Sequence, residues 1–231
     1  MKHKKVVVII PAFNEEQSVG RVLRDIPTGL VQEVIVVNNN STDETARHAR
    51  MAGATVLDEP HQGYGRACLK GMQYVSTLPA LPDIIVFLDA DYSDFPEEMP
   101  KLLQPVMEED FDLVVGARAS GNRERGSMTP QQILGNWIAT KLLKLIYRVH
   151  FTDLGPFRAI KYEKLLALNM TDKSYGWTIE MQIKAAKMRL KTTEIPVRYR
   201  VRIGQSKVSG TLKGTLMAGY KIITTIFKYA Y

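Results

Sequence analysis

Two patterns in the 231-residue chain predict an α/β fold with a doubly wound, mostly parallel sheet. The first is a run of five apolar residues at 84–88, which is typical of a strand buried on both faces. The second is the alternation of such runs with segments of helical periodicity, which is typical of βαβ units. A C-terminal segment with one apolar and one basic side adds an amphipathic helix.

The predicted strands are short apolar runs rich in β-branched residues. They cover residues 6–10, 33–37, 54–57, 84–88 and 113–116. Helical periodicity between them predicts helices over 19–26, 44–52 and 96–107. A further helix is predicted to begin at residues 63–67 and to run through Tyr74. After a polar loop at 119–129, we expect helices over 130–149 and 175–190, an extended segment over 192–202, and a last helix over 212–231.

Polar clusters follow four of these strands, at 11–16, 38–43, 89–91 and 116–118. Because parallel strands end at one edge of the sheet, and ligands of such sheets bind beyond that edge, the four clusters predict one site.

Within this site, Asp89 and Asp91 come directly after a buried strand and point to the same side of it. Two neighbouring carboxylates repel each other unless a cation lies between them. A hard divalent ion, Mg²⁺ or Mn²⁺, shared with substrate phosphates would meet that need. The alternative is a solvated strand end with two acidic residues and no ligand.

The net charge of +7 is concentrated near the C-terminus. Residues 181–231 carry eleven Lys and Arg against Glu194 alone, whereas residues 1–180 carry 20 basic and 23 acidic residues. This predicts an anionic partner at that end of the chain: a membrane surface, phosphate or nucleic acid. On a helical wheel, Lys213, Lys221 and Lys228 lie opposite an apolar side, so the last helix either lies in a membrane interface or covers the core of the domain.

Composition limits the remaining possibilities. A single cysteine, Cys68, excludes an internal disulfide framework and suits a reducing compartment. The apolar run at 6–10 is too short for a signal peptide, and no window is long and apolar enough to predict a spanning helix. We therefore expect a catalytic domain over 1–210 and a basic amphipathic membrane-interface helix over 211–231.

The motifs, taken in order, resemble a known family. Pro11-Ala12-Phe13-Asn14-Glu15, the turn at 38–43, Gly63-x-Gly65-x-Ala67, Asp89-Ala90-Asp91 and Gly116-x-Arg118 resemble the inverting GT-A (Rossmann-like) glycosyltransferases. The likeness is greatest to the dolichyl- and polyprenyl-phosphate hexosyltransferases, the dolichyl-phosphate mannose synthase group, and it runs from residue 5 to about residue 210.

The resemblance implies a role for each matching residue. Nucleotide-sugar contacts are expected at Pro11, Ala12, Asn14, Glu15, Asn38, Asn40, Gly65 and Asp89. Catalytic roles are expected for Asp89, Asp91 and Arg118, with Asp89 and Asp91 as the metal ligands. Contacts to the acceptor phosphate are expected at Arg118, Arg158, Arg202, Ser206 and Lys207.

The chain departs from the family pattern at several positions. Asn38-Asn39-Asn40-Ser41 stands where the family often has Asp-Asp-Gly-Ser, which leaves open whether the donor is a UDP- or a GDP-hexose. Ser93 stands where the mannose synthases often have Gln. Pro156 replaces a Gly, and the C-terminal transmembrane helices of many relatives are not matched.

The expected function is metal-dependent, inverting transfer of a hexose from a nucleotide-diphosphate sugar to a polyprenyl phosphate at the inner, cytoplasmic face of a membrane. A phosphate acceptor needs cations rather than a general base, because its second pKa is about 6. The alternative is a carbohydrate hydroxyl acceptor, for which Asp94 is the candidate base. Glu180 either contacts sugar hydroxyls or favours the first turn of its helix. Nucleic acid is not expected as a partner, because it would leave the two carboxylates unexplained and the basic tail does not interleave aromatic residues in the manner of single-strand binders.

Overall fold

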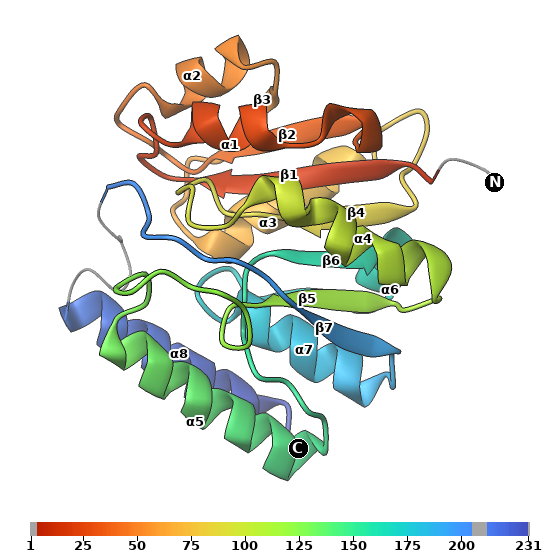
Figure 1. Cartoon of the computed structure of the whole chain (residues 1–231), viewed down its shortest axis with the longest axis vertical. Helices are drawn as coiled ribbons and strands as arrows, with labels where there is room; N and C mark the ends of the chain where they lie inside the picture. Colours follow the sequence, from red (N-terminus) through yellow and green to blue (C-terminus); the bar gives the residue numbers. More distant parts are fainter. Residues whose placement is uncertain (1–3, 205–211, 231) are drawn as a thin grey trace.

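Seven strands form one mixed sheet in the computed structural model, which describes residues 4–204 and 212–230 (Figure 1). The strands lie in the order β3-β2-β1-β4-β6-β5-β7. Their bounds are β1 Val6–Ala12, β2 Glu33–Asn38, β3 Thr55–Asp58, β4 Ile84–Phe87, β5 Leu113–Ala117, β6 Arg158–Lys161 and β7 Thr192–Pro196. β6 is antiparallel to β4 and β5, and every other pair is parallel. The predicted doubly wound, mostly parallel sheet is therefore confirmed.

Helices cover both faces of the sheet. Their bounds are α1 Val19–Asp25, α2 Thr45–Met51, α3 Tyr64–Val75, α4 Met99–Glu108, α5 Pro130–Tyr147, α6 Tyr162–Ala167, α7 Trp177–Lys187 and α8 Leu212–Lys228, with short 3-10 turns η1 Thr28–Leu30 and η2 Pro96–Glu98. Because strand side chains alternate, Val7 and Ile9 face α3 and α7, whereas Val8 and Ile10 face α1 and α4. Each face thus has its own apolar core, and the central strands are buried on both sides.

The register of the central strands determines where the polar turns lie. Ile9 of β1 pairs with Phe87 at the end of β4, and Ala12 pairs with Asn38 at the end of β2. The backbone N–H of Leu88 also donates to the carbonyl of Ile9. The turns after β1, β2 and β4 therefore meet at one edge of the sheet, as predicted.

β6 and α6 were not predicted. β6 has only four residues and begins and ends with a basic residue, Arg158 and Lys161, so it does not appear as an apolar run. In the sheet it lies between β4 and β5, where Ala159 pairs with Val86 on one side and Val114 on the other. Its strand conformation depends on these two distant partners, which local sequence does not specify.

α5 and α8 form a separate layer, side by side at one end of the molecule (Figure 1). α8 packs on α5 and α7, its Ile226 is fully buried, and the Tyr147 hydroxyl donates to the Ile226 carbonyl. Several apolar side chains of the two helices are exposed: Ile133, Leu134, Trp137, Leu145, Leu216, Met217 and Tyr220. α8 thus covers part of the core and also presents apolar residues to solvent. Within the described residues, none of the helices is both long and apolar enough to cross a membrane.

Candidate active site

Two cavities meet at the predicted edge of the sheet. The first, the strand-end cavity, has a volume of about 250 Å³ and is lined by Pro11, Ala12, Phe13, Glu15, Asn39, Gln62, Gly63, Tyr64, Asp89, Ala90, Asp91, Tyr175 and Arg202. The second, the helix cavity, has a volume of about 300 Å³ and extends between α5 and α8, where Gln131, Gln132, Gly135, Asn136, Ala218, Gly219 and Ile222 line it. Tyr64, Asp89, Asp91, Tyr175 and Arg202 line both cavities, so the two spaces adjoin at the paired carboxylates.

Asp89 and Asp91 lie where the two cavities meet. Asp89 accepts a hydrogen bond from the Tyr64 hydroxyl at 3.0 Å, and Asp91, which is buried, accepts one from the backbone N–H of Ser93 at 2.9 Å. Burial raises the pKa of Asp89 to about 7, and the neighbouring charge of Asp91 adds to this effect. The pair is therefore destabilised in its fully ionised form, and a bound cation would relieve that repulsion.

These two carboxylates are the residues that fit a divalent ion. No group of three or more His, Cys, Asp or Glu side chains suited to a metal occurs within residues 4–204 and 212–230. An ion held by Asp89 and Asp91 would need further oxygen ligands from substrate phosphates or water, which is the usual arrangement for Mg²⁺. A cation already faces this position, because Nη1 of Arg202 lies 3.1 Å from Oδ2 of Asp91.

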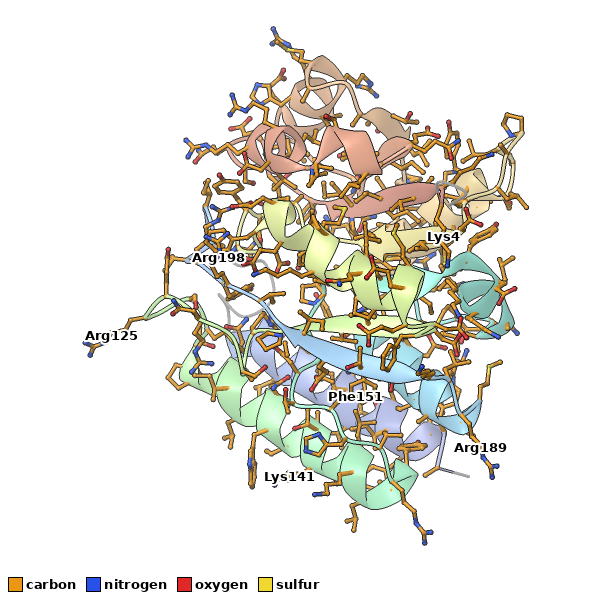
Figure 2. The ribbon with its side chains drawn as sticks, turned by 45° about the vertical axis from the view of Figure 1, so that its right-hand side comes forward. Lys4, Arg125, Lys141, Phe151, Arg189 and Arg198 are labelled. Atoms are coloured by element: carbon orange, nitrogen blue, oxygen red, sulfur yellow. The ribbon has the colours of Figure 1, made fainter. Side chains whose placement is uncertain are left out.

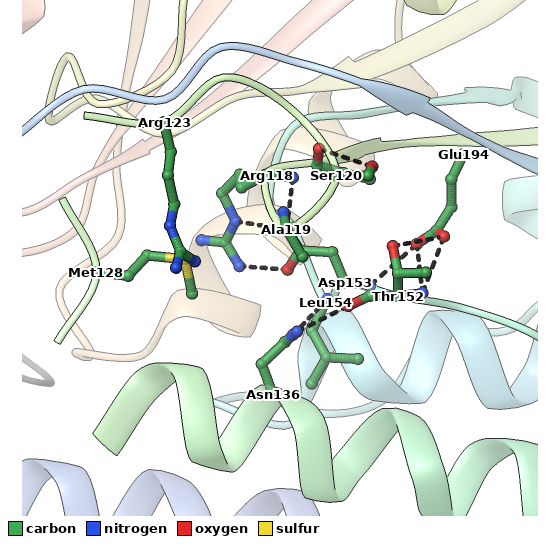
Figure 3. Close-up of polar contacts among 12 residues, drawn as sticks. Arg118, Ala119, Ser120, Arg123, Met128, Asn136, Thr152, Asp153, Leu154 and Glu194 are labelled. Atoms are coloured by element: carbon green, nitrogen blue, oxygen red, sulfur yellow. Dashed lines mark hydrogen bonds and ion pairs between the residues drawn. The ribbon is translucent and has the colours of Figure 1, made fainter. Parts of the chain in front are cut away.

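Arg118 lines the helix cavity and is held by Asp153 (Figure 3). Its Nε and Nη2 donate to the two oxygens of Asp153 at 3.0 and 2.7 Å, and its backbone N–H donates to Oδ2 at 2.6 Å. The ring of Tyr199 packs against the guanidinium, 5.0 Å from its Cζ to the ring centroid. Burial opposes ionisation of Asp153, but the charge and hydrogen bonds of Arg118 lower its pKa below the ordinary value. This bidentate pair fixes the guanidinium and leaves Nη1 without a bond to Asp153.

The loop that carries Asp153 is held from two sides (Figure 3). Glu194 of β7 accepts from the backbone N–H groups of Thr152 and Asp153, at 2.8 and 3.0 Å. Asn136 of α5 donates to the Thr152 carbonyl at 2.8 Å and accepts from the Leu154 N–H at 2.9 Å. The position of Arg118 therefore depends on groups from a strand and a helix that are distant in the sequence.

Comparisons with known proteins identify the family to which this site belongs. Residues 7–168 match the family described as Glycosyl transferase family 2. The chain belongs to glycosyl transferase family 2. It is 35% identical over 214 residues to an uncharacterized glycosyltransferase of Mycobacterium tuberculosis, covering 92% of this chain and 94% of the relative. It is 32% identical over 209 residues to the dolichyl-phosphate hexose transferase of Haloferax volcanii (88% and 86%), and 28% identical over 225 residues to the undecaprenyl-phosphate mannosyltransferase of Micrococcus luteus (91% and 90%).

Solved structures agree with this assignment at the level of the fold. Glucosyl-3-phosphoglycerate synthase from Mycobacterium tuberculosis, crystallised with Mn²⁺, UDP and glucosyl-3-phosphoglycerate, superposes with a TM-score of 0.77. The sequences are 23% identical, and the match covers 98% of this chain and 80% of the synthase. The expected glycosyltransferase class and GT-A fold are thus confirmed.

Of the residues expected to contact the nucleotide sugar in this family 2 enzyme, Pro11, Ala12, Glu15 and Asp89 line the strand-end cavity. Asn14 does not line either cavity. Its side chain accepts from the Thr42 N–H at 2.8 Å and its own N–H donates to the Ser41 hydroxyl, so it joins the first two polar turns.

At the second turn, the residue that lines a cavity is the neighbour of the two that were predicted to contact the nucleotide. Asn38 and Asn40 line neither cavity: the Asn38 side chain donates to Asp58, and Asn40 is exposed. Asn39, between them, points into the strand-end cavity. Its amide donates to the His61 carbonyl at 2.7 Å and accepts from the Gly63 N–H at 2.7 Å. Alternation of side chains along the end of β2 gives the inward position to the middle residue.

Two further residues have structural roles in place of the expected contacts. Gly65 does not line either cavity, and a Cβ there would overlap the backbone carbonyl of Asp172, so glycine permits close packing of α3 on that loop. Arg158 was predicted to bind the acceptor, but it is fully buried. It donates to the carbonyls of Gly155 and Thr178, and burial lowers its pKa to about 10. Because its donors stabilise the 154–155 turn, it supports the site from within the core.

The remaining predicted residues fall in three places. Arg202 lines both cavities. Ser206 and Lys207 lie outside the described residues. Asp94 and Glu180 are buried and line neither cavity. Glu180 accepts from the Thr171 hydroxyl and the Asp172 N–H and pairs with Lys184, so it anchors the loop before α7 rather than contacting a sugar.

Proposed function

We propose that this family 2 enzyme transfers a hexose from a nucleotide-diphosphate sugar to a polyprenyl phosphate, with inversion at the anomeric carbon. One observation carries the proposal. The cavity beyond the strand ends adjoins, at Asp89 and Asp91, a second cavity that runs between two helices with an exposed apolar surface. A polar donor and an acceptor with a phosphate head and an apolar chain match these two spaces.

The strand-end cavity suits the donor. Glu15 lines this cavity and is the carboxylate expected to contact the nucleoside, Asn39 fixes the cavity wall through its bonds to the backbone of His61 and Gly63, and Asp89 and Asp91 lie where the diphosphate would end. Mg²⁺ or Mn²⁺ held by the two carboxylates would stabilise the negative charge that develops on the departing nucleoside diphosphate. The Mn²⁺ and UDP in the crystals of glucosyl-3-phosphoglycerate synthase support this assignment.

The helix cavity suits a phosphate acceptor better than a hydroxyl acceptor. Asp89 and Asp91 are the sole carboxylates among the described residues that line it, and the same set contains no histidine, so no separate general base is present there. Asp94, the candidate base for a hydroxyl acceptor, does not reach the cavity. A phosphate oxygen needs no base, and Arg118 offers its free Nη1 to hold the phosphate.

The reaction follows from this placement. An acceptor phosphate oxygen attacks the anomeric carbon and forms the new C–O bond from the face opposite the leaving group. The bond between that carbon and the β-phosphate oxygen breaks, and the nucleoside diphosphate leaves with the electron pair. No proton is transferred in this step. Arg118, fixed by Asp153, positions the nucleophile.

The α5–α8 layer supports our proposals for the lipid chain and for the location of the enzyme. Exposed apolar residues on both helices are accompanied by basic ones, Lys141 and Lys144 on α5 and Lys228 on α8, and Lys141 projects outward from its helix (Figure 2). Apolar burial and attraction to anionic lipid together hold peripheral proteins on membranes. We place the enzyme on the inner face of the membrane, and the names of the Haloferax and Micrococcus relatives support a polyprenyl phosphate as acceptor.

The test is a screen of radiolabelled UDP- and GDP-hexoses against a polyprenyl phosphate, 3-phosphoglycerate and free sugars, with Mn²⁺ or with EDTA. We expect metal-dependent transfer to the polyprenyl phosphate, with Asp89→Asn as the inactive control. Faster transfer to 3-phosphoglycerate would assign a soluble phosphate acceptor. Faster transfer to free sugars would favour a hydroxyl acceptor. Sedimentation with anionic and neutral vesicles at low and high salt tests the location separately.

A further inference from the structure

Arg202 bridges two carboxylates that come from different strand ends. Its Nη2 lies 2.7 Å from Oε1 of Glu15, which follows β1, and its Nη1 lies 3.1 Å from Oδ2 of Asp91, which follows β4. Because Arg202 lines both cavities, its guanidinium lies where the two spaces adjoin. In this state the positive charge beside the paired carboxylates is the guanidinium of Arg202.

The backbone around Arg202 is anchored, whereas its side chain has room to move. The Arg200 N–H donates to the Ser93 carbonyl at 2.9 Å, and the Ile203 N–H donates to the Asp91 carbonyl at 3.0 Å. The side chain of Arg202 is 26% exposed to solvent. Its Nε has no hydrogen-bond partner among the described residues, so one donor of the guanidinium group is unused. A change of rotamer can therefore move the charge without moving the chain.

This arrangement competes with a metal ion. A divalent ion bound to Asp91 would lie close to a guanidinium that contacts the same carboxylate, and two positive charges at that distance repel. The diphosphate of a nucleotide sugar offers the displaced guanidinium a new anionic partner, for which the planar fork of arginine is well suited.

We propose that Arg202 is a built-in counter-cation that exchanges partners when the donor binds. In the empty enzyme it neutralises Asp91 and Glu15 at the place where the two cavities adjoin. When the metal ion and the nucleotide diphosphate bind, it leaves Asp91 for the diphosphate. Arg202 thereby acts as a positioning residue that holds the empty metal site neutral and then receives the donor diphosphate. This inference rests on the proposed donor, not on the proposed acceptor.

The decisive measurement is the affinity for Mn²⁺ alone, without nucleotide, by calorimetry or by electron paramagnetic resonance of free Mn²⁺. Arg202→Gln should bind Mn²⁺ about tenfold more tightly than the wild type, because Asp91 loses a competing cation. Arg202→Met, which removes the same charge and keeps an apolar stem, should agree. Arg200→Gln is the matched control, since it removes an equal charge two residues away from a side chain that lines neither cavity.

The nucleotide should respond in the opposite direction. With Mn²⁺ saturating, Arg202→Gln should bind UDP or GDP, whichever the wild type prefers, about tenfold more weakly. Unchanged or weaker binding of Mn²⁺ alone in both Arg202 variants would overturn the inference. Equal tightening in Arg200→Gln would also overturn it, because the effect would then be diffuse electrostatics. No acceptor is present, so a failed acceptor screen would leave these results intact.

Discussion

Gly135 of α5 offers a direct test of the path between α5 and α8. It lines the helix cavity, and no heavy atom lies within 4 Å of the position that a Cβ would occupy. Gly135→Leu would therefore place four carbon atoms in a cavity of about 300 Å³ without a backbone clash. Replacing a helical glycine by leucine stabilises the helix by up to about 1 kcal/mol, so the fold should be retained or strengthened.

We expect Gly135→Leu to raise the KM for the acceptor and not the KM for the donor. Displacing the equivalent of two or three methylene groups of a prenyl chain removes about 2 kcal/mol of binding, which is about thirtyfold in the KM for polyprenyl phosphate. The KM for the nucleotide sugar should stay within about twofold, because Gly135 does not line the strand-end cavity. Steady-state kinetics with each substrate varied in turn, paired with a melting curve, measures both quantities.

Gly20→Leu is the matched control for this experiment. Gly20 lies in α1, also has open space at its Cβ position, and lines neither cavity. It should change neither KM. A stable Gly135→Leu enzyme with unchanged use of the polyprenyl phosphate would refute the path between α5 and α8. A similar increase in both KM values would instead indicate a general distortion of the site.

Three other predictions concern single side chains. Asp89→Asn or Asp91→Asn should lower transfer at least about 10²-fold, because the leaving group loses its counter-ion, and full activity in EDTA would contradict this. Arg118→Ala should raise the KM for the acceptor much more than the KM for the donor, and equal increases for both substrates would place Arg118 on the donor side. Asp153→Asn should have the same effect on the two KM values. It should also destabilise the fold by about 3–5 kcal/mol, because Arg118 would remain buried and unpaired. Burial opposes ionisation of Glu180, but Lys184, Tyr229 and neighbouring N–H groups outweigh it and lower its pKa to about 2, so its contribution is present above its ordinary pKa and is lost as the pH falls towards 2. Urea unfolding from about pH 5 to about pH 2 should show wild type losing on the order of 3 kcal/mol more than Glu180→Gln, and parallel pH profiles would refute this.

The sequence by itself determined the parallel part of the sheet and one edge of the site. Buried parallel strands are continuous apolar runs, and these runs were correctly located for the central strands β1, β2 and β4. Because parallel strands end at one edge, the polar residues that follow them had to converge there. Pro11, Glu15, Asp89 and Asp91 could therefore be assigned to one site without a structure.

Residues whose roles depend on distant partners could be placed only by the tertiary structure. Asp153 belongs to none of the motifs that the sequence analysis singled out, and its importance comes from its pairing with Arg118, 35 residues away. Asn136 supports the loop that carries Asp153 because α5 packs against that loop. Helical periodicity predicts a helix but not the segment against which the helix packs. Arg158, which the sequence alone suggested as a phosphate contact, donates its hydrogen bonds to backbone carbonyls in the core.

The same limit applies to the choice between neighbouring residues and between neighbouring cavities. Which of Asn38, Asn39 and Asn40 points inward depends on where β2 leaves the sheet, and this is decided by its pairing with β1. Whether α8 covers the core or lies in a membrane interface was left open by its amphipathic pattern. Packing on α5 and α7 shows that α8 covers part of the core, and it leaves other apolar residues of the helix exposed. Periodicity and charge are local properties that a sequence records. The meeting of Arg202 with Glu15, 187 residues away, depends on the register of the whole sheet, and only the folded chain brings them together.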